Sequence, residues 1–295
     1  MGRDLFSQFA EARAVFDAAD DALGEKLSRM CFEGPEESLI LTANTQPAVL
    51  AVSIAAHAVF GARAPPPAFA AGHSLGEYSA LVAAGALGLA SALRAVRERG
   101  RLMQQAVPPA EGAMAAVIGL APETIEQICE RVCAGRVLEP ANYNSPEQTV
   151  IAGHADAVER AAAAMEGAGA KRVIRLQVSA PFHCSLMKPI EPRLQQVLGG
   201  ISFAAPRYPV ISNVEAKPNA DRDRIVPLLL EQVHRPVRWV ESVQQMRREG
   251  VTHFVELGPG KVLRGLIKRI CTGEAVSVED SASLKKALET VGRGL

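Results

Sequence analysis

The chain has 295 residues and 32 basic against 32 acidic side chains, so its formal net charge is zero. This balance argues against a general nucleic-acid binder, and no apolar run reaches the length needed to span a bilayer. The first residues also lack the basic-then-apolar layout of a signal peptide. The five cysteines are odd in number and scattered, which is typical of reduced thiols and predicts a cytoplasmic protein.

The N-terminal stretch predicts helices. Residues 1–30 predict one amphipathic helix, because their apolar side chains recur at roughly helical spacing. No strand precedes this helix, which is unusual for an α/β enzyme. Residues 45–60 predict a second helix with Pro47 near its first turn. This helix is apolar on almost every face and is therefore expected to be buried.

Residues 69–86 have the layout of a nucleophile elbow. A short apolar strand leads into the turn Gly72-His-Ser-Leu-Gly76, and a helical pattern follows from Glu77. In a G-x-S-x-G elbow the flanking glycines permit a strained turn that exposes the serine hydroxyl beside the first helical amides. Ser74 and Glu77 also fit a capping box, so a simple helix cap is the alternative role of Ser74.

A separate unit is expected after the next helix, which spans 91–106 and carries four arginines. Strands at 113–118, 137–143, 148–152 and 172–176 and helices at 122–132 and 155–166 give a βαββαβ order, which is typical of a ferredoxin-like unit. We therefore expect residues 111–178 to be a small domain inserted into a larger α/β domain of residues 1–110 and 179–295.

The remaining chain is again predicted to alternate between helices and strands. After a loop at 178–185 we expect helices at 186–198, 221–232, 240–248, 261–270 and 283–291, and strands at 208–212, 252–257 and 275–278. Alternation on both sides of the insert predicts an α/β fold with a mainly parallel sheet.

A serine nucleophile needs a base within hydrogen-bond reach. Of the six histidines, His183 is favoured because it lies in an irregular, proline-containing loop. His73 directly precedes the serine and is expected to point away from it, and His57 lies within an apolar helix and is expected to be structural. Cys129 and Cys133 share a helix, but no further ligand completes a metal site.

Two features near the C-terminus have some of the character of binding sites. The turn Gly258-Pro-Gly260-Lys261 lacks the Ser or Thr that a phosphate loop requires, since Val262 follows the lysine, so a tight turn is favoured. The next helix carries a basic face that is either solvated surface or a docking site for an acidic partner or a coenzyme phosphate. That face comprises Lys261, Arg264, Lys268 and Arg269.

Eight ordered motifs resemble one enzyme family: Gly72-His-Ser-Leu-Gly-Glu-Tyr-Ser-Ala80, Arg99-Gly100, Met103-Gln104, Gly112-Ala-Met-Ala115, Asn142-Tyr-Asn-Ser-Pro146, Val150-Ile-Ala-Gly153, Pro181-Phe-His183 and Glu256-Leu-Gly-Pro-Gly260. The family is the malonyl-CoA:acyl carrier protein transacylases of type II fatty-acid synthesis, which are related to polyketide synthase acyltransferase domains. The resemblance spans nearly the whole chain. It implies an α/β-hydrolase-like large domain with the ferredoxin-like insert.

The resemblance also implies roles for residues. Ser74 would attack the malonyl thioester of malonyl-CoA while His183 takes its proton, and the malonyl group would pass to the thiol of acyl carrier protein by ping-pong kinetics. The backbone carbonyl of Gln232 would hold the imidazole, and the backbone N–H of Leu75 would stabilise the oxyanion. No cofactor is implied, and a monomer is expected.

Substrate selection follows from three further positions that the resemblance assigns. Arg99 would bind the free malonate carboxylate through a bidentate pair, so acetyl-CoA would leave a buried guanidinium unpaired. Phe182 would crowd a branched methylmalonyl group. Asn142 and Asn144 would line the cleft between the domains, although a purely structural role in a turn is an equal alternative.

One departure from the family concerns the start of the chain. Family members begin with a strand and a glutamine-containing loop ahead of the position that matches Met1, and that glutamine supplies a second oxyanion amide. We expect Met1 to be an internal methionine or the chain to be truncated, which sequencing of the natural N-terminus would test. The alternative functions are a serine esterase or thioesterase acting on acyl-CoA, and a catalytically impaired member that only binds acyl carrier protein.

Overall fold

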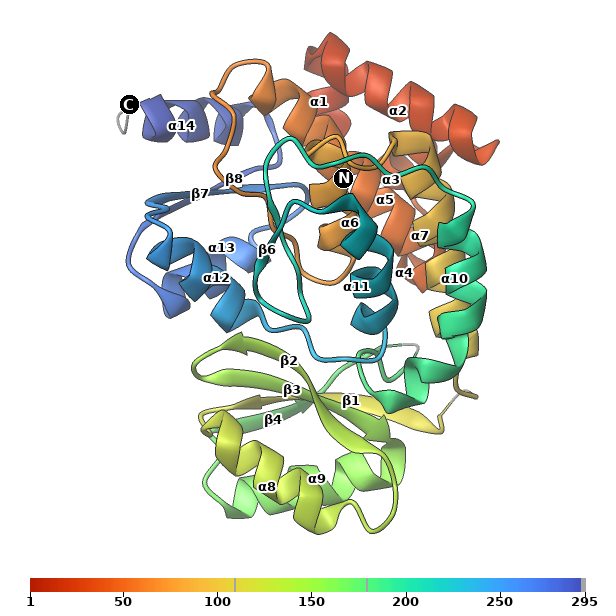
Figure 1. Ribbon diagram of the computed structural model, residues 1–295, viewed down its shortest axis with the longest axis vertical. Helices are drawn as coiled ribbons and strands as arrows, with labels where there is room; N and C mark the ends of the chain where they lie inside the picture. The colour runs from red at the N-terminus through yellow and green to blue at the C-terminus, as the bar shows by residue number, and fades with distance from the viewer. Residues whose placement is uncertain (109, 179, 293–295) are drawn as a thin grey trace.

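The N-terminal region is built from helices in the computed structural model, which describes residues 1–108, 110–178 and 180–292 (Figure 1). The single helix expected over residues 1–30 is wrong: α1 (Arg3–Gln8), α2 (Ala10–Leu23) and α3 (Leu27–Glu33) take its place, followed by α4 (Glu36–Ile40). The breaks have local causes, because Phe9 is extended and Gly24 ends α2 in the left-handed conformation at φ 65°.

The buried helix α5 (Thr42–Gly61) begins three residues earlier than expected and contains Pro47 in its second turn. Leu50, Ala51 and Val52 on consecutive positions have no exposed surface, so every face of α5 is packed. The chain then forms α6 (Leu75–Ala83) and α7 (Leu89–Gln105), both of which contact α5. The strand expected before α6 is reduced to one parallel bridge, between Ala70 and Val210, because the chain turns immediately afterwards.

The ferredoxin-like arrangement predicted for the middle of the chain is confirmed. Its elements are β1 (Gly112–Ile118), α8 (Pro122–Val132), β2 (Leu138–Ser145), β3 (Gln148–His154), α9 (Ala155–Gly167) and β4 (Arg172–Arg175). The strands form one antiparallel sheet in the order β2-β3-β1-β4. Helices α8 and α9 cover one face of this sheet, and the other face is turned toward the rest of the molecule (Figure 1). The domain boundaries stay a prediction.

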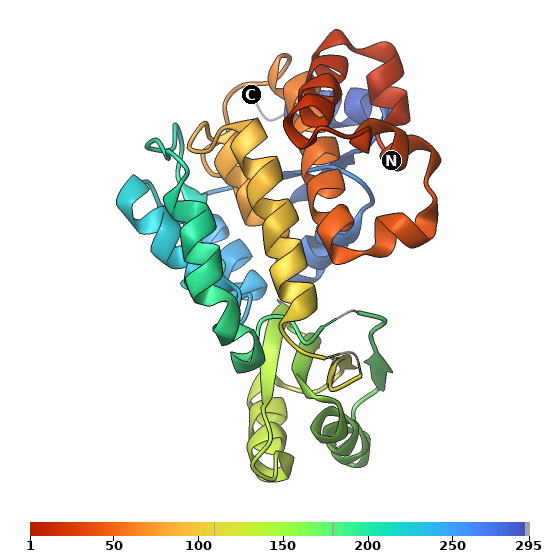
Figure 2. The same cartoon turned by 90° about the vertical axis from the view of Figure 1, so that its right-hand side faces the viewer.

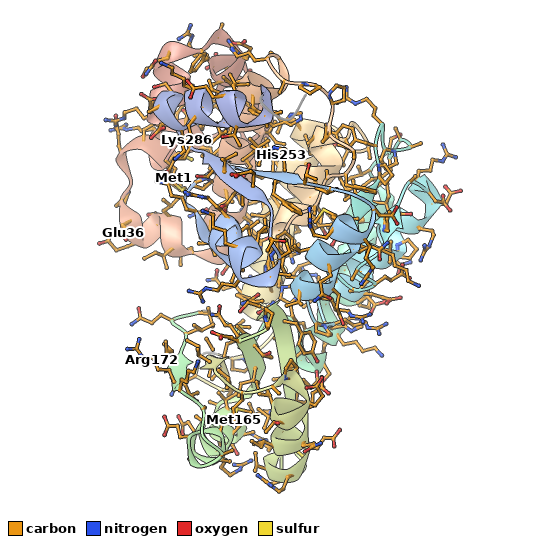
Figure 3. All side chains as sticks on the ribbon, turned by 90° about the vertical axis from the view of Figure 1, so that its left-hand side faces the viewer. Met1, Glu36, Met165, Arg172, His253 and Lys286 are labelled. Atoms are coloured by element: carbon orange, nitrogen blue, oxygen red, sulfur yellow. The ribbon has the colours of Figure 1, made fainter. Side chains whose placement is uncertain are left out.

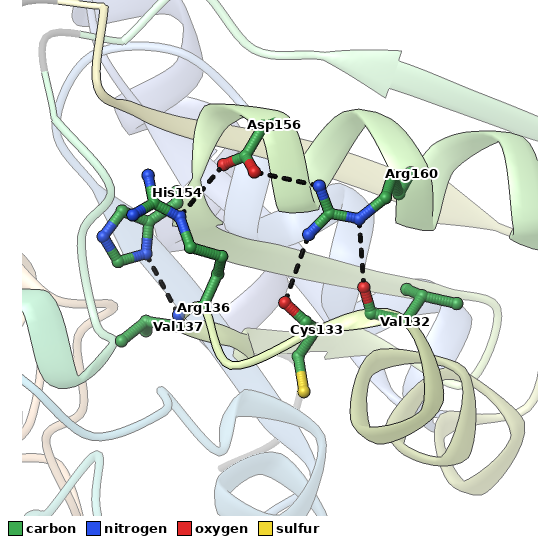
Figure 4. A network of polar contacts seen from close by, with 7 residues as sticks. All are labelled: Val132, Cys133, Arg136, Val137, His154, Asp156 and Arg160. Atoms are coloured by element: carbon green, nitrogen blue, oxygen red, sulfur yellow. Dashed lines mark hydrogen bonds and ion pairs between the residues drawn. The ribbon is translucent and has the colours of Figure 1, made fainter.

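A polar network joins the ends of the two helices of this unit (Figure 4). Asp156 accepts hydrogen bonds from Arg136 at 3.4 Å and Arg160 at 2.9 Å. Arg160 also donates to the carbonyl oxygens of Val132 and Cys133, which satisfies the C-terminal end of α8. Because these charged groups are exposed, the network contributes little to the free energy of unfolding. Its main effect is to hold the ends of the two helices in place.

The last third of the chain returns to the larger part of the molecule. Its elements are η1 (Ser185–Ile190), α10 (Glu191–Gly199), β5 (Val210–Ile211), β6 (Pro218–Asn219), η2 (Arg222–Arg224), α11 (Ile225–Gln232), α12 (Trp239–Arg248), β7 (His253–Leu257), α13 (Val262–Ile270), β8 (Glu274–Val278) and α14 (Ser281–Gly292). β7 and β8 pair in parallel, as expected for the α/β fold. The antiparallel partner of β5, strand β6, was not predicted.

The two parts of the molecule meet along one side of the sheet. Figure 2 shows α7 and α10 side by side, with the ferredoxin-like unit projecting beyond their ends. In Figure 3, Met165 lies inside this unit and Arg172 on its outer side. Within the described residues, no helix is both long enough and apolar enough to cross a membrane.

The tight turn before α6 generates a stability prediction. A Cβ atom on Gly72 would lie 2.0 Å from the carbonyl group of Gly76, which is rigid backbone, whereas a Cβ on Gly76 would meet no atom within 4 Å. Gly72→Ala should therefore lower the free energy of unfolding by about 3 kcal/mol. Gly76→Ala, a matched control inside a helix, should leave it unchanged or raise it by about 0.5–1 kcal/mol. Urea unfolding of both variants measures this, and equal stabilities would contradict the account of the turn.

Candidate active site

Ser74 is held in a strained position between the Ala70 bridge and α6. Its backbone has φ 53° and ψ −106°, a region that non-glycine residues rarely adopt. It stands at the N-cap of α6, but its side chain makes no capping hydrogen bond. The alternative that Ser74 is only a helix cap is therefore wrong, and its hydroxyl is available for other contacts.

The hydroxyl of Ser74 is hydrogen-bonded to His183, 109 residues further along the chain. Ser74 Oγ lies 2.7 Å from His183 Nε2, and His183 Nδ1 lies 2.7 Å from the backbone oxygen of Gln232. Because a carbonyl oxygen only accepts, Nδ1 carries the proton and Nε2 is left as the acceptor for the serine proton. This is the tautomer that a general base requires.

The loop that carries His183 packs against the open face of the ferredoxin-like sheet. Cys184 is fully buried there among Met114, Ala141 and Val150, and Phe182 packs partly against the same cluster. His183 itself has φ 60°, a second strained backbone. The sheet therefore positions the imidazole, and the larger part of the molecule positions the serine.

Burial keeps His183 neutral. Desolvation, together with the nearby charge of Arg99, lowers the pKa of His183 to about 3, although the hydrogen bond to Gln232 opposes the shift. A neutral imidazole with a free Nε2 lone pair can take the proton of the serine at any pH near neutrality.

Arg99 of α7 lies against the same hydroxyl. Its Nη2 group donates to Ser74 Oγ at 3.1 Å and to Gln232 Oε1 at 2.9 Å, and its Nη1 group donates to Gln46 Oε1 at 2.7 Å. The side chain is buried, and its Nε group has no partner among the described residues. The guanidinium therefore retains donor capacity beside the serine.

Three residues that sequence analysis missed complete the surroundings of Ser74. Gln46 binds Arg99, Glu77 accepts a hydrogen bond from the Gln232 side chain at 2.8 Å, and Asn213 Oδ1 accepts from the backbone N–H of Ser74 at 2.7 Å. Each left a signal. Gln46 and Glu77 are polar residues in mostly apolar helices, and Asn213 follows a strand at its carboxyl end, where ligand sites of α/β proteins gather.

The structure places the other predicted site residues around this centre. Leu75 opens α6, and its backbone N–H has no hydrogen-bond partner among the described residues. Asn142 is buried in β2, and its backbone bridges Val237 of the larger part. Asn144 Oδ1 is 2.8 Å from His73 Nε2, so His73 faces away from Ser74, as expected.

The basic residues of α13 lie elsewhere on the molecule. Arg264 donates to the backbone oxygen of Ala275, and Lys268 is exposed. Arg269 lines a cavity of about 640 Å³ together with Lys171 and Arg172 of the ferredoxin-like unit. In the described part of the chain, no group of three or more His, Cys, Asp or Glu residues is placed to hold a metal ion.

A larger cavity of about 1180 Å³ lies behind the elbow, between residues 69–72 and β7. His73 and Leu75 line it, but Ser74, Arg99 and His183 do not. The cavity is therefore separate from the hydroxyl of Ser74.

A partly buried serine hydroxyl bonded to a buried, neutral histidine at the start of a helix is the arrangement of a serine-dependent acyl-transfer site. The chain belongs to the acyl transferase domain family, whose model matches residues 1–288. It is 47% identical to the malonyl CoA-acyl carrier protein transacylase of Escherichia coli (strain K12) over 290 residues, which covers 97% of this chain and 93% of the relative.

Solved structures agree with this family. A crystal structure of an acyl carrier protein S-malonyltransferase from Vibrio cholerae O1 superposes with a TM-score of 0.95 at 48% identity, over 97% of this chain and 94% of the other. A type II PKS acyl-carrier protein in complex with its malonyl-transacylase gives a TM-score of 0.96 at 47% identity, over 98% and 94%. The fold expected from the resemblance is thereby confirmed.

The neutral state of His183 predicts an unusual pH dependence. Labelling of Ser74 by a fluorophosphonate, a serine-specific reagent, should keep its rate within about twofold from pH 8 to pH 5, because His183 stays unprotonated over this range. A base with an ordinary histidine pKa would lose about 30-fold at pH 5. Such a loss would contradict the assignment, and native fluorescence at each pH serves as the control for unfolding.

Proposed function

We propose that this chain transfers the malonyl group of malonyl-CoA to the phosphopantetheine thiol of acyl carrier protein, through a malonyl ester of Ser74. The observation that carries the proposal is the contact of Ser74 Oγ with both His183 and Arg99. The first contact supplies the base, and the second supplies a cation for the free carboxylate of the substrate. The names of the relatives support the same substrate and carrier.

The reaction runs in two half-steps. His183 Nε2 takes the proton of Ser74 as Oγ attacks the thioester carbonyl, and the developing oxyanion is stabilised by the N–H of Leu75 at the start of α6. Collapse expels the coenzyme A thiolate, which receives the proton from His183. The carrier thiol then repeats these steps on the malonyl ester and regenerates the free serine. Ser74 as nucleophile and His183 as acid and base carry both half-steps, so the proposed reaction needs no cofactor.

Selectivity in this proposal comes from Arg99. A malonyl carboxylate can pair with its guanidinium in the bidentate geometry that lysine lacks. Acetyl-CoA offers no carboxylate and gains nothing from this charge. Phe182 and Asn142 are proposed to border the acyl group, since both lie where the ferredoxin-like sheet meets the larger part.

The carrier is proposed to dock on the basic surface of Arg264, Lys268 and Arg269. Lys171 and Arg172 of the ferredoxin-like unit line the same cavity as Arg269. This supports the proposed docking site, because basic side chains from both parts of the molecule contribute positive potential there. Arg269→Glu should slow discharge by the carrier and leave loading by malonyl-CoA unchanged.

Five free cysteines support a reducing, cytoplasmic setting.

The proposal is tested by the intact mass of the protein after brief incubation with malonyl-CoA or acetyl-CoA. A malonyl adduct should form on Ser74, persist in water and disappear on addition of acyl carrier protein. Rapid loss of the adduct in water without a carrier would identify the alternative, an acyl-CoA thioesterase. No adduct on Ser74 and no release of free coenzyme A would contradict both.

The role of Arg99 has its own prediction. Arg99→Ala should reduce the malonyl-over-acetyl ratio of kcat/KM about 100-fold, because it removes a charge-assisted pair in a buried site. Arg101→Ala is the control on the same helix, since Arg101 is exposed and pairs with the partly exposed Glu98 at 3.5 Å. Loading of Arg99→Ala with acetyl-CoA shows that the variant is folded. An unchanged ratio would rule out the carboxylate-binding role.

A further inference from the structure

Glu77 is a buried carboxylate that the proposed reaction does not use. It lies one turn after Ser74 on α6 and is 4% exposed. Desolvation raises its pKa to about 7, although two hydrogen bonds and the charge of Arg99 oppose the shift. A carboxylate is costly to bury, so its presence beside the serine calls for a compensating purpose.

The contacts of Glu77 point to one partner. Its Oε2 atom accepts from Gln232 Nε2 at 2.8 Å and from the backbone N–H of Asn213 at 3.0 Å. Gln232 Nε2 also donates to the backbone oxygen of Ser74 at 3.0 Å. The amino group of this carboxamide therefore faces two acceptors.

The opposite end of the same carboxamide faces Arg99. Gln232 Oε1 accepts from Arg99 Nη2 at 2.9 Å. If the carboxamide were reversed, its amino group would face the guanidinium, which only donates. Its oxygen would face the backbone oxygen of Ser74, which only accepts, and Glu77, which only accepts when it is ionised. Glu77 and the backbone oxygen of Ser74 together thus fix which end of Gln232 meets Arg99, and Glu77 makes the shorter of the two contacts.

We propose that Glu77 is a positioning residue for substrate selection, which holds Arg99 beside Ser74 by fixing the orientation of the Gln232 carboxamide. The proposal rests on the function proposed above and deepens it. We assign this effect to the placement of the Glu77 oxygen, because the hydrogen bonds that link it to Arg99 run through the Gln232 carboxamide. His183 is held by the backbone of Gln232 and is less dependent on Glu77.

Two conservative substitutions separate geometry from charge. Glu77→Gln keeps an oxygen that can accept both hydrogen bonds but removes the charge. Glu77→Asp keeps the charge but withdraws the carboxylate by one methylene from Gln232. Glu98→Asp, a partly exposed position on α7, controls for the shortening itself.

The measurement is the malonyl-over-acetyl ratio of kcat/KM for loading of Ser74, with fluorophosphonate labelling as a readout that needs no carboxylate site. Glu77→Gln should keep the ratio within about threefold of the unsubstituted enzyme. Glu77→Asp should lower it about 10- to 100-fold, as expected for a lost hydrogen bond to a charged group, and should change labelling less than threefold.

Three outcomes would overturn the proposal. A ratio that survives in Glu77→Asp but falls in Glu77→Gln would assign the effect to charge. Equal losses for malonyl, acetyl and fluorophosphonate reactions would indicate a merely structural role. Unchanged ratios in both variants would show that Gln232 needs no such support.

Failure of the function proposed above is recognised separately, because the unsubstituted enzyme would then form no malonyl adduct. Crystal structures of the two variants test the positioning in that case as well. The contact between Arg99 Nη2 and Gln232 Oε1 should remain within hydrogen-bond distance in Glu77→Gln and be lost in Glu77→Asp, and its persistence in both would refute the proposal.

Discussion

Gln232 is the residue on which the geometry of the acyl-transfer site depends. As the last residue of α11 it has no exposed surface, so each of its buried polar atoms needs a partner. Its backbone oxygen binds His183, and its carboxamide binds Arg99, Glu77 and the backbone of Ser74. One buried residue thereby fixes a base through its backbone and a cation and a nucleophile through its side chain, and these three groups come from different segments.

This network also holds two backbones that would not otherwise adopt their conformations. Ser74 and His183 both have positive φ angles without being glycines, and each such residue typically costs about 1–3 kcal/mol. Ser74 is restrained by Asn213, which accepts from its N–H and donates to the oxygen of Gly72 at 2.7 Å. His183 is restrained by the packing of Cys184 against the ferredoxin-like sheet. The strained pair therefore lies where the two parts of the molecule join.

Much of this arrangement could be predicted from the sequence, for identifiable reasons. The βαββαβ order could be predicted because its strands and helices are regular and separated by clear turns. Ser74 was readable because a nucleophile elbow needs glycines at fixed positions, as the close approach of Gly72 to Gly76 illustrates. His183 could be preferred as the base because it lies in an irregular loop. Its partner, the backbone oxygen of Gln232, could be predicted only from the family resemblance.

The parts that could not be predicted depend on contacts distant in the sequence. Gln46 and Glu77 meet their partners across 53 and 155 residues, and periodicity carries no information about such pairs. Glu77 was interpreted only as half of a capping box, a local pattern that its buried side chain does not follow. The division of the N-terminal region into short helices was missed because an extended Phe9 and a left-handed Gly24 interrupt a pattern that otherwise stays amphipathic.

The central claim is that Arg99 and His183 serve one acyl group on Ser74. A crystal structure of the enzyme trapped as its malonyl-serine ester tests this directly. The account predicts that Arg99 leaves Ser74 Oγ and binds both oxygens of the malonyl carboxylate, while Gln232 keeps its contacts with His183 and Glu77. A malonyl carboxylate that points away from Arg99 into solvent would contradict it.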